Sequence, residues 1–450
     1  MSTGRANLLR CLFQYTLVAV LGVNLLILLV AYFSGTHQNT IWTDVGNLLQ
    51  FQSGDDSWMP MNRALDILLN SQTPVYEQLF FIEKVKFQYP LTSLIPLYLL
   101  RGLLQEPDQL LFALHCLSLL AVLATVYFAV RILLKAMQDN GIVLSTKERT
   151  AWMVLAGIMV LNFYPVIKAF SLGQLQAIIN LLVTAALWQW MQQKKTTAGI
   201  LIALAVLCKP QYGLLLLWAA IRKEWRFAIG MIVVLAIGGL TALWLFGFEQ
   251  NIAYLKVLSH ISKIGEGFYA NQSMNGLLNR WLFNGNNLYW DAKGFAPFHP
   301  VVYYGSLLVT VLLLMSALIL PVRAGAKSTY WDIGIMILSA TAASPVAWEH
   351  HYGVVIGLFA AALPFIWIRS QKTIWLLALS YLLVSNCFTI TNVVAEYPII
   401  NVAQSYLYLG VLLLLYCLYT ILYQGRLHQK ALEKGSVAIC NMAVSPLLSP

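Results

Sequence analysis

Asp44 is the residue with the clearest capacity for acid–base chemistry, and it lies shortly beyond the first long apolar run of the sequence. A carboxylate beside an apolar surface can have its pKa raised and can then serve as a general base. The other interpretation is a solvated polar loop, because Asp55, Asp56 and Asp66 follow in the same segment and charge clusters usually face water. Both interpretations of Asp44 are open at this point.

Several other kinds of site have no support in the sequence. The six cysteines include no C-x-x-C pair, so neither a zinc site nor a redox pair is indicated. Neither a P-loop nor a dinucleotide-binding glycine motif is present, which leaves no nucleotide cofactor to predict. His350 and His351 are adjacent, so their side chains diverge by about 100° on a helix, whereas metal ligands need a common face. We therefore expect neither a metal nor a cofactor.

The elements that must position Asp44 are predicted from composition. Hydrophobic residues make up 59% of the 450 residues and charged residues only 10%, against about 25% charged in a soluble domain. This composition excludes a disordered chain and a water-soluble globule. The net charge is +10, but the basic residues stand singly or in small groups between apolar runs, as in membrane loops. The sequence predicts an all-α polytopic membrane protein with no nucleic-acid partner.

Runs long enough to cross a bilayer, about 20 residues, are spread along the chain. We predict about twelve transmembrane helices, with outer loops at 34–88 and 247–299 that contain interfacial helices near 61–69 and 252–264. Residues 1–425 form one domain and 426–450 a cytoplasmic tail. The predicted spans are 8–33, 89–104, 109–135, 150–166, 170–191, 197–219, 227–246, 300–320, 329–347, 351–368, 373–390 and 402–424.

Basic residues orient these spans. Arg222, Lys223 and Arg226 mark a cytoplasmic loop, and this assignment places both long loops on the outer face. Twelve spans would nevertheless put Lys194 and Lys195 outside, against the rule. An alternative topology makes 89–104 re-entrant and splits 197–219 into a short hairpin at Lys209-Pro210. Of the two topologies, we prefer twelve spans.

Several short strings, taken in order, resemble glycosyltransferase family 87. Each is weak alone, but six in this order over residues 44–351 are fairly specific. The strings that follow Asp44 are Thr73-Pro74-Val75-Tyr76, Phe87-Gln88-Tyr89-Pro90-Leu91, Tyr164-Pro165-Val166 with Gly173-Gln174, Lys209-Pro210-Gln211, Asn271-Gln272-Ser273-Met274-Asn275-Gly276 and Ser344-Pro345-Val346-Ala347-Trp348-Glu349-His350-His351.

The resemblance implies a GT-C architecture and an inverting transfer from a polyprenyl-phosphate sugar at the outer side of the cytoplasmic (inner) membrane. It also implies that Asp44 is the base, because the family's aspartate after the first helix maps to this position. Mannose is the sugar that the family favours, and arabinofuranose is an alternative. The family often has Asp-His-His where this chain has Glu349-His350-His351, so the carboxylate is retained on a longer side chain.

Such a transfer needs cations beside the departing phosphate. Lys209 interrupts an apolar run, and a charged residue within a span is a functional candidate by default; a snorkelling lysine is the alternative. The other candidates lie near the predicted outer face, and the two histidines stand where an outer turn enters a helix. The predicted phosphate ligands are Lys84, Lys86, Lys209, Arg280, His350 and His351.

Amides, carboxylates and aromatic rings near the outer face are candidates for the sugar and the acceptor. Amides suit sugar hydroxyls, although loop capping is the alternative for the amides and an aromatic belt for the tryptophans. The predicted sugar and acceptor contacts are Asn271, Gln272, Asn275, Tyr89, Trp348 and Glu349.

The predicted partners are membrane lipids, the lipid-linked sugar donor and an acceptor that is a glycolipid, a glycan or an exported protein. Two other classes compete with the enzyme. A transporter or flippase of lipid-linked sugars would show paired broken helices and inverted repeats, which we do not find in the sequence. A structural subunit that only binds a lipid-linked sugar would tolerate replacement of Asp44.

Overall fold

The computed structural model describes residues 3–33, 41–71, 73–325 and 327–443. The start of the predicted loop 34–88 and the end of the predicted tail 426–450 therefore lie outside the described residues. Helices make up the regular structure of the described ranges, and the only β pairing in them is one isolated antiparallel bridge between Asn271 and Trp348. The predicted all-α class is confirmed for this part of the chain.

Six helical segments of the described chain are long and apolar enough to cross a membrane. A seventh is possible if α6 (Thr146–Leu161) and α7 (Tyr164–Ser171), which are bent by 55°, count as one span. The predicted number of about twelve is therefore not confirmed. The six are α1 (Thr3–Phe33), α5 (Pro107–Asp139), α11 (Trp225–Phe246), α15 (Pro300–Arg323), η4 with α17 (Glu349–Val355 and Ile356–Arg369) and η6 with the first half of α19 (Ile400–Ser405 and Tyr406–Ala443).

The remaining apolar runs form shorter helices. The predicted span 89–104 consists of the 3-10 helix η2 (Leu91–Leu94) followed by nine residues of α4 (Ile95–Leu103). The other short helices of this kind are α8 (Gln176–Met191), α9 (Lys195–Val206), α10 (Leu214–Arg222), α16 (Tyr330–Ala342) and α18 (Gln371–Ser385).

The predicted span 197–219 is a helical hairpin. Lys209 is extended, with φ −134° and ψ 96°, because a residue before proline avoids the helical region. The 3-10 turn η3 (Pro210–Gly213) then separates α9 from α10. Lys195 Nζ lies 2.6 Å from Glu224 Oε1, so both ends of the hairpin lie on the same side of the molecule. The hairpin alternative describes this segment, which removes the conflict over Lys195.

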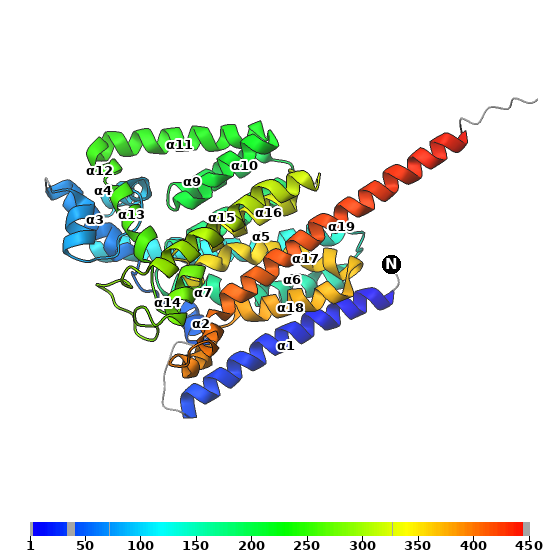
Figure 1. The fold of residues 1–450 in the computed structure, drawn as a ribbon, viewed down its shortest axis with the longest axis horizontal. Helices are drawn as coiled ribbons and strands as arrows, with labels where there is room; N and C mark the ends of the chain where they lie inside the picture. Colours follow the sequence, from blue (N-terminus) through cyan, green and yellow to red (C-terminus); the bar gives the residue numbers. More distant parts are fainter. Residues whose placement is uncertain (1–2, 34–40, 72, 326, 444–450) are drawn as a thin grey trace, which may run out of the picture.

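Short helices gather at one end of the bundle, opposite the N-terminus (Figure 1). Among them, α3 and α13 confirm the helices that the amphipathic patterns predict near 61–69 and 252–264. The group consists of α2 (Ile41–Leu49), α3 (Trp58–Asn70), α12 (Phe248–Ile252), α13 (Tyr254–Ile264) and α14 (Met274–Trp281). The π-helix η1 (Glu77–Ile82) and the 3-10 helix η5 (Thr389–Val394) complete the irregular connections.

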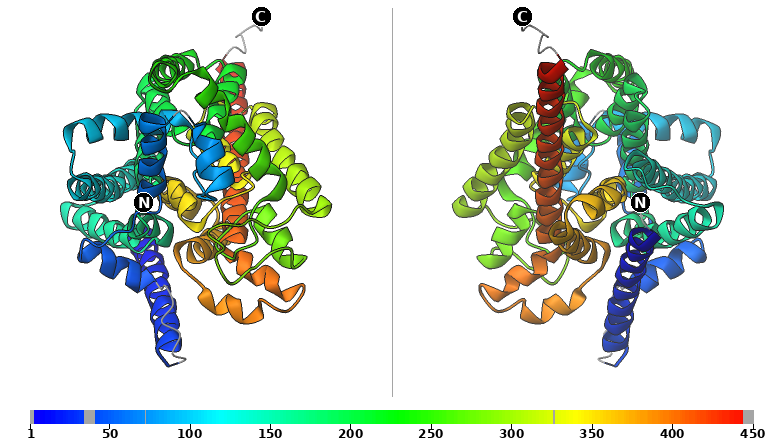
Figure 2. Two further views of the ribbon diagram at one scale, coloured as in Figure 1. Left: turned by 90° about the vertical axis from the view of Figure 1, so that its left-hand side faces the viewer. Right: turned by 90° about the vertical axis from the view of Figure 1, so that its right-hand side faces the viewer.

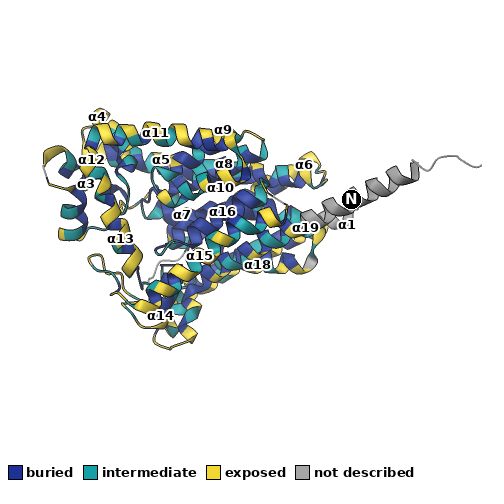
Figure 3. Ribbon diagram, turned by 45° about the horizontal axis from the view of Figure 1, so that its top comes forward, coloured by how far each residue is buried: buried dark blue, intermediate teal, exposed yellow. Residues whose placement is uncertain are grey.

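Helices α7 and α16 are almost entirely buried within the bundle (Figure 3). The long helix α1 lies at the edge, where it contacts α18 (Figure 2). At the other terminus, α19 continues as one helix into the predicted tail, as far as Ala443. The buried position of α7 matters most for the site, because this helix touches both α2 and η4.

Candidate active site

Asp44 forms a buried ion pair with Lys168. Asp44 lies in α2 and is 1% exposed, while Lys168 lies in α7 and is 7% exposed. Lys168 Nζ is 3.3 Å from Asp44 Oδ1. The second carboxylate oxygen, Oδ2, has no hydrogen-bond partner among the described residues. Buried carboxylate oxygens nearly always have a partner, so a free one marks a place where a ligand can bind.

The turn after α7 holds α2 and the segment behind it in place. Asn47 Nδ2 donates to Ser171 Oγ at 2.7 Å, and Gly54 N donates to Ser171 O at 2.9 Å. Gly173 has a φ of +68°, and a Cβ atom there would lie 1.8 Å from Gly54 O. Only glycine permits this conformation and this approach together. The turn that contains Gly173 and Gln174 therefore holds in place the segment that carries Asp44.

Gln174 extends these contacts to residues 56–57 and to Tyr89. Its Oε1 accepts hydrogen bonds from Ser57 Oγ at 2.8 Å and from Tyr89 Oη at 3.1 Å, and its Nε2 donates to Asp56. Tyr89, predicted as a sugar contact, thus has its hydroxyl engaged in a network inside the protein.

Glu349 lies in η4, which also packs against α7. Its Oε2 accepts a hydrogen bond from Tyr164 Oη at 3.0 Å, and its Oε1 accepts one from Tyr406 Oη at 3.2 Å. The backbone around it pairs with the loop before α14, because Glu349 N donates to Ala270 O at 3.1 Å. Asp44 and Lys168 both act electrostatically on Glu349, so two carboxylates share one buried lysine.

The two histidines and Lys209 form a buried polar group with free atoms. His350 and His351 pack edge to face, with ring centroids 4.8 Å apart. Lys209 and Lys168 both act electrostatically on His350. Within the described chain, Lys209 Nζ, His350 Nε2 and His351 Nδ1 are buried and have no hydrogen-bond partner. These three nitrogens therefore remain free to contact an anionic ligand.

Burial raises the pKa of Asp44 above its ordinary value of 3.8, and the nearby Lys168 opposes the shift in part. The carboxylate is consequently a stronger base than an exposed aspartate. A base of this kind, with one free oxygen, can accept a proton from a hydroxyl group that approaches it.

Arg280 and the three predicted amides form hydrogen bonds within the fold. Arg280 Nη1 donates to the carbonyls of Phe268 and Asn271, and Nη2 donates to Ser405 Oγ at 2.6 Å. The Asn271 side chain donates to Glu266 O and Pro345 O and accepts from Ala347 N. The Gln272 side chain donates to Tyr269 O and Gln404 O and accepts from Tyr408 N. Asn275 Oδ1 accepts a hydrogen bond from Glu266 N. In the described chain these side chains hold the loop that positions Glu349, and of their nitrogens only Asn275 Nδ2 and Arg280 Nε lack a partner.

Lys84 and Lys86 lie with aromatic residues beside this loop. Lys86 Nζ is 2.9 Å from Glu266 Oε2 and 3.6 Å from the centroid of the Trp290 ring. Trp290 packs against Trp348, with ring centroids 5.0 Å apart. Asp44 forms its ion pair with Lys168, and neither Lys84 nor Lys86 takes part in it. Trp348 belongs to this aromatic group and directly precedes Glu349 in the sequence.

Sequence reasoning missed Lys168, Tyr164 and Tyr406. Lys168 interrupts an apolar run of the sequence in the same way as Lys209, so the rule that identifies Lys209 would also identify Lys168. The two tyrosines carry no comparable signal, because aromatic residues are abundant in this chain. Their role follows only from their contacts with Glu349.

Among the described residues, no group of three or more His, Cys, Asp or Glu side chains is arranged to hold a metal ion. In a comparison with known families, the model of glycosyltransferase family 87 matches residues 87–345. No curated protein matches the chain.

Proposed function

The chain belongs to glycosyltransferase family 87, and we propose that it moves a hexose or pentose from a polyprenyl-phosphate sugar to an acceptor hydroxyl. The family makes the protein a glycosyltransferase, and its apolar helices make it membrane-embedded. The donor, the sugar of mannose or arabinofuranose type, and the glycolipid, glycan or exported-protein acceptor belong to the proposal. So does a position in the inner membrane with the reaction at its outer, periplasmic side.

One observation carries this proposal: a buried base with a free oxygen is linked to buried nitrogen groups with free atoms through Lys168, which pairs with Asp44 and acts electrostatically on His350. Asp44 Oδ2 is the free oxygen, and Lys209 Nζ, His350 Nε2 and His351 Nδ1 are the free nitrogens among the described residues. The reaction has the same division, because a hydroxyl group must lose a proton while a phosphate leaves with negative charge.

In the proposed step, the acceptor oxygen attacks the anomeric carbon and its proton passes to Asp44. The bond between the anomeric carbon and the phosphate oxygen breaks, and the electron pair leaves with the polyprenyl phosphate. Lys209, His350 and His351 stabilise the departing phosphate by charge and hydrogen bonds. Lys168 keeps Asp44 oriented, and attack from the side opposite the phosphate inverts the anomeric centre.

Most of the remaining predicted residues have supporting roles in this proposal. The exceptions are Lys84 and Lys86, predicted as phosphate ligands, which line the cavity described in the next subsection. Glu349 and Trp348 contact the sugar or the acceptor, since Glu349 is next to His350 and Trp348 offers a ring for stacking. Asn271, Gln272, Asn275, Arg280 and Tyr89 position these residues through the bonds described above. The proposed chemistry requires no metal or cofactor.

Replacement of Asp44 tests the mechanism. Asp44→Asn keeps the size of the side chain but cannot accept the proton, so we expect transfer to fall by about 10²–10⁴-fold. The measurement is transfer from a labelled polyprenyl-phosphate sugar in membranes with matched protein levels. Asp55→Asn is the control, because Asp55 is an exposed acid of the same segment. Near-normal transfer by Asp44→Asn would contradict the mechanism, and donor translocation without transfer would favour a flippase.

A further inference from the structure

A cavity lies between α13, the π-helix η1 and the loop before α15. Its volume is about 280 Å³. The cavity has a basic side and an aromatic side, and neither is part of the Asp44 group. The residues that define it are Phe80, Lys84, Lys86, His260, Lys293 and Phe295.

The basic side carries positive charge that the protein does not neutralise. Lys86 is paired with Glu266 at 2.9 Å. Lys84 and Lys293, in contrast, have no ion-pair partner within 4.0 Å in the described chain. Asp291 is the other nearby acid, and its carboxylate accepts hydrogen bonds from the backbone of Lys293 and Gly294. Lys84 and Lys293 are thus exposed residues that line the cavity, and neither has an ion-pair partner among the described residues.

The aromatic side gives the cavity an apolar wall. The His260 ring packs edge to face against Phe80 and Phe81, at centroid distances of 5.8 Å and 5.4 Å, and lies 6.0 Å from Phe295. Lys86 Nζ lies over the Phe295 ring at 4.4 Å. A ligand that satisfies both sides must carry an anionic group and an apolar part together.

The position of the cavity indicates where such a ligand comes from. Helix α13 is amphipathic, with Val257 and Ile261 buried and Leu255 and Leu258 exposed. Exposed apolar residues on a helix that also carries lysines are typical of a helix lying in the membrane interface. Phosphodiester headgroups occupy the same depth, and lysine side chains bind them as point charges.

We propose that this cavity is a binding site for the headgroup of an anionic phospholipid, separate from the site of the sugar donor. The phosphodiester contacts Lys84 and Lys293, and the glycerol backbone and first methylene groups lie against Phe80 and Phe295. The proposal does not depend on the identity of the donor or on the role of Asp44.

Short-chain lipids test this site on the full-length protein in detergent. We expect dihexanoyl phosphatidylglycerol to bind about tenfold more tightly than dihexanoyl phosphatidylcholine, whose choline cancels the charge of the phosphate. Binding is measured by thermophoresis. Equal affinity for the two lipids would overturn the proposal. Inorganic phosphate should bind at least about tenfold more weakly than phosphatidylglycerol, and equal binding would make this a site for free anions rather than for lipid.

Paired variants locate the binding. Lys84→Gln with Lys293→Gln should weaken phosphatidylglycerol binding by about tenfold, because both uncompensated charges are removed. Lys147→Gln with Lys372→Gln changes the net charge equally at exposed positions outside the cavity, and its affinity should equal that of the wild type. Unchanged binding in the first pair would overturn the proposal. Lys209→Met should also leave binding unchanged, and a loss there would place the lipid in the Asp44 group instead.

Discussion

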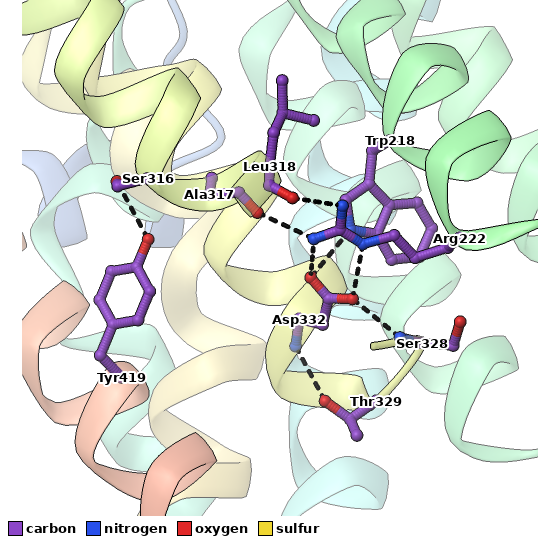
Figure 4. A network of polar contacts seen from close by, with 9 residues as sticks. All are labelled: Trp218, Arg222, Ser316, Ala317, Leu318, Ser328, Thr329, Asp332 and Tyr419. Atoms are coloured by element: carbon purple, nitrogen blue, oxygen red, sulfur yellow. Dashed lines mark hydrogen bonds and ion pairs between the residues drawn. The ribbon is translucent and has the colours of Figure 1, made fainter. Parts of the chain in front are cut away.

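Two buried ion pairs of this protein differ in how fully their charged atoms are hydrogen-bonded. Arg222 and Asp332, at the end of the bundle away from α2, are fully buried and form two hydrogen bonds to each other at 3.0 and 2.9 Å. Arg222 also donates to Leu318 O and Ala317 O, and Asp332 accepts from Trp218 and from the backbone of Ser328 (Figure 4). Asp44 and Lys168 share one contact of 3.3 Å, and Asp44 Oδ2 has no partner among the described residues.

The difference distinguishes a structural ion pair from a functional one. In the Arg222 pair every charged atom is used, so the pair fixes α10, α15 and α16 relative to one another and has no capacity left for a ligand. In the Asp44 group, oxygen and nitrogen atoms are buried at a cost in free energy and left unsatisfied within the described chain. Burial alone therefore does not identify a site. The Asp44 group differs because several titratable side chains with unsatisfied atoms gather around one buried lysine.

Breaking the structural pair should have the largest effect on stability. Asp332→Ala leaves the Arg222 guanidinium buried without a countercharge, so we expect a loss of about 3–5 kcal/mol of unfolding free energy. Thermal unfolding of the purified protein measures this loss. Asp139→Ala is the control, because Asp139 forms an exposed pair with Lys135 one helical turn away. A stable Asp332→Ala protein would show that the two pairs do not differ as described.

Lys209→Met should reduce transfer without reducing stability, in contrast to the loss of stability expected for Asp332→Ala. The buried ammonium has no partner in the described chain, so an apolar side chain of similar length should leave stability unchanged or increase it. Transfer should fall by about 10–100-fold, because one cation beside the leaving phosphate is lost. Lys194→Met, at an exposed position, should change neither quantity. A Lys209→Met protein that unfolds like Asp332→Ala would assign Lys209 a structural role.

The pH dependence of transfer tests whether the Asp44 carboxylate is the base and whether Lys168 controls its ionisation. The Asp44 base works only when it is ionised, so the rate should rise with pH through the pKa that burial raises above 3.8. Lys168→Met removes the charge that lowers this pKa, and the acidic limb of the profile should move to higher pH. The raised pKa also means that ionised Asp44 reduces the free energy of unfolding, and this cost disappears as the pH falls below the ordinary value. An acidic limb that stays in place would contradict this assignment.

Lys195→Gln should have the smallest effect. Lys195 and Glu224 are partly exposed, at 22% and 12%, and pairs of this kind contribute about 0–1 kcal/mol. We expect a change in that range and unaltered transfer. A loss comparable to that of Asp332→Ala would mean that the hairpin depends on this pair as much as the bundle depends on Arg222.

Much of the fold can be predicted from apolar patterns, and the errors have specific causes. The long helices α1, α5, α11 and α15 follow runs that the sequence marks clearly. Apolar length does not show whether a run crosses the membrane, and for this reason the full spans predicted at 89–104 and 197–219 are not confirmed. The Lys209-Pro210 pair is the local signal for a turn, and the positive-inside conflict at Lys195 is the second signal.

Part of the site can be predicted from the sequence, because residue type and position are visible there but tertiary contacts are not. Asp44 stands out by residue type and place, and Lys209 by its charge within an apolar run. The bonds of Asn271 and Gln272 cannot be predicted, because their partners Pro345 and Gln404 are distant in the chain, at separations of 74 and 132 residues. Residue type shows what a side chain can bind, whereas the fold determines whether another part of the protein already occupies it.

The closed base of the α9–α10 hairpin has a consequence for experiments on the whole chain. Since Lys195 and Glu224 meet, reporter enzymes fused just before and just after the hairpin would both report the same compartment. Fusion mapping would then count no crossing between residues 191 and 225, although a lysine from this stretch lies deep within the protein. A chain truncated inside the hairpin would lack α10 and with it Arg222, and should be degraded rather than inserted.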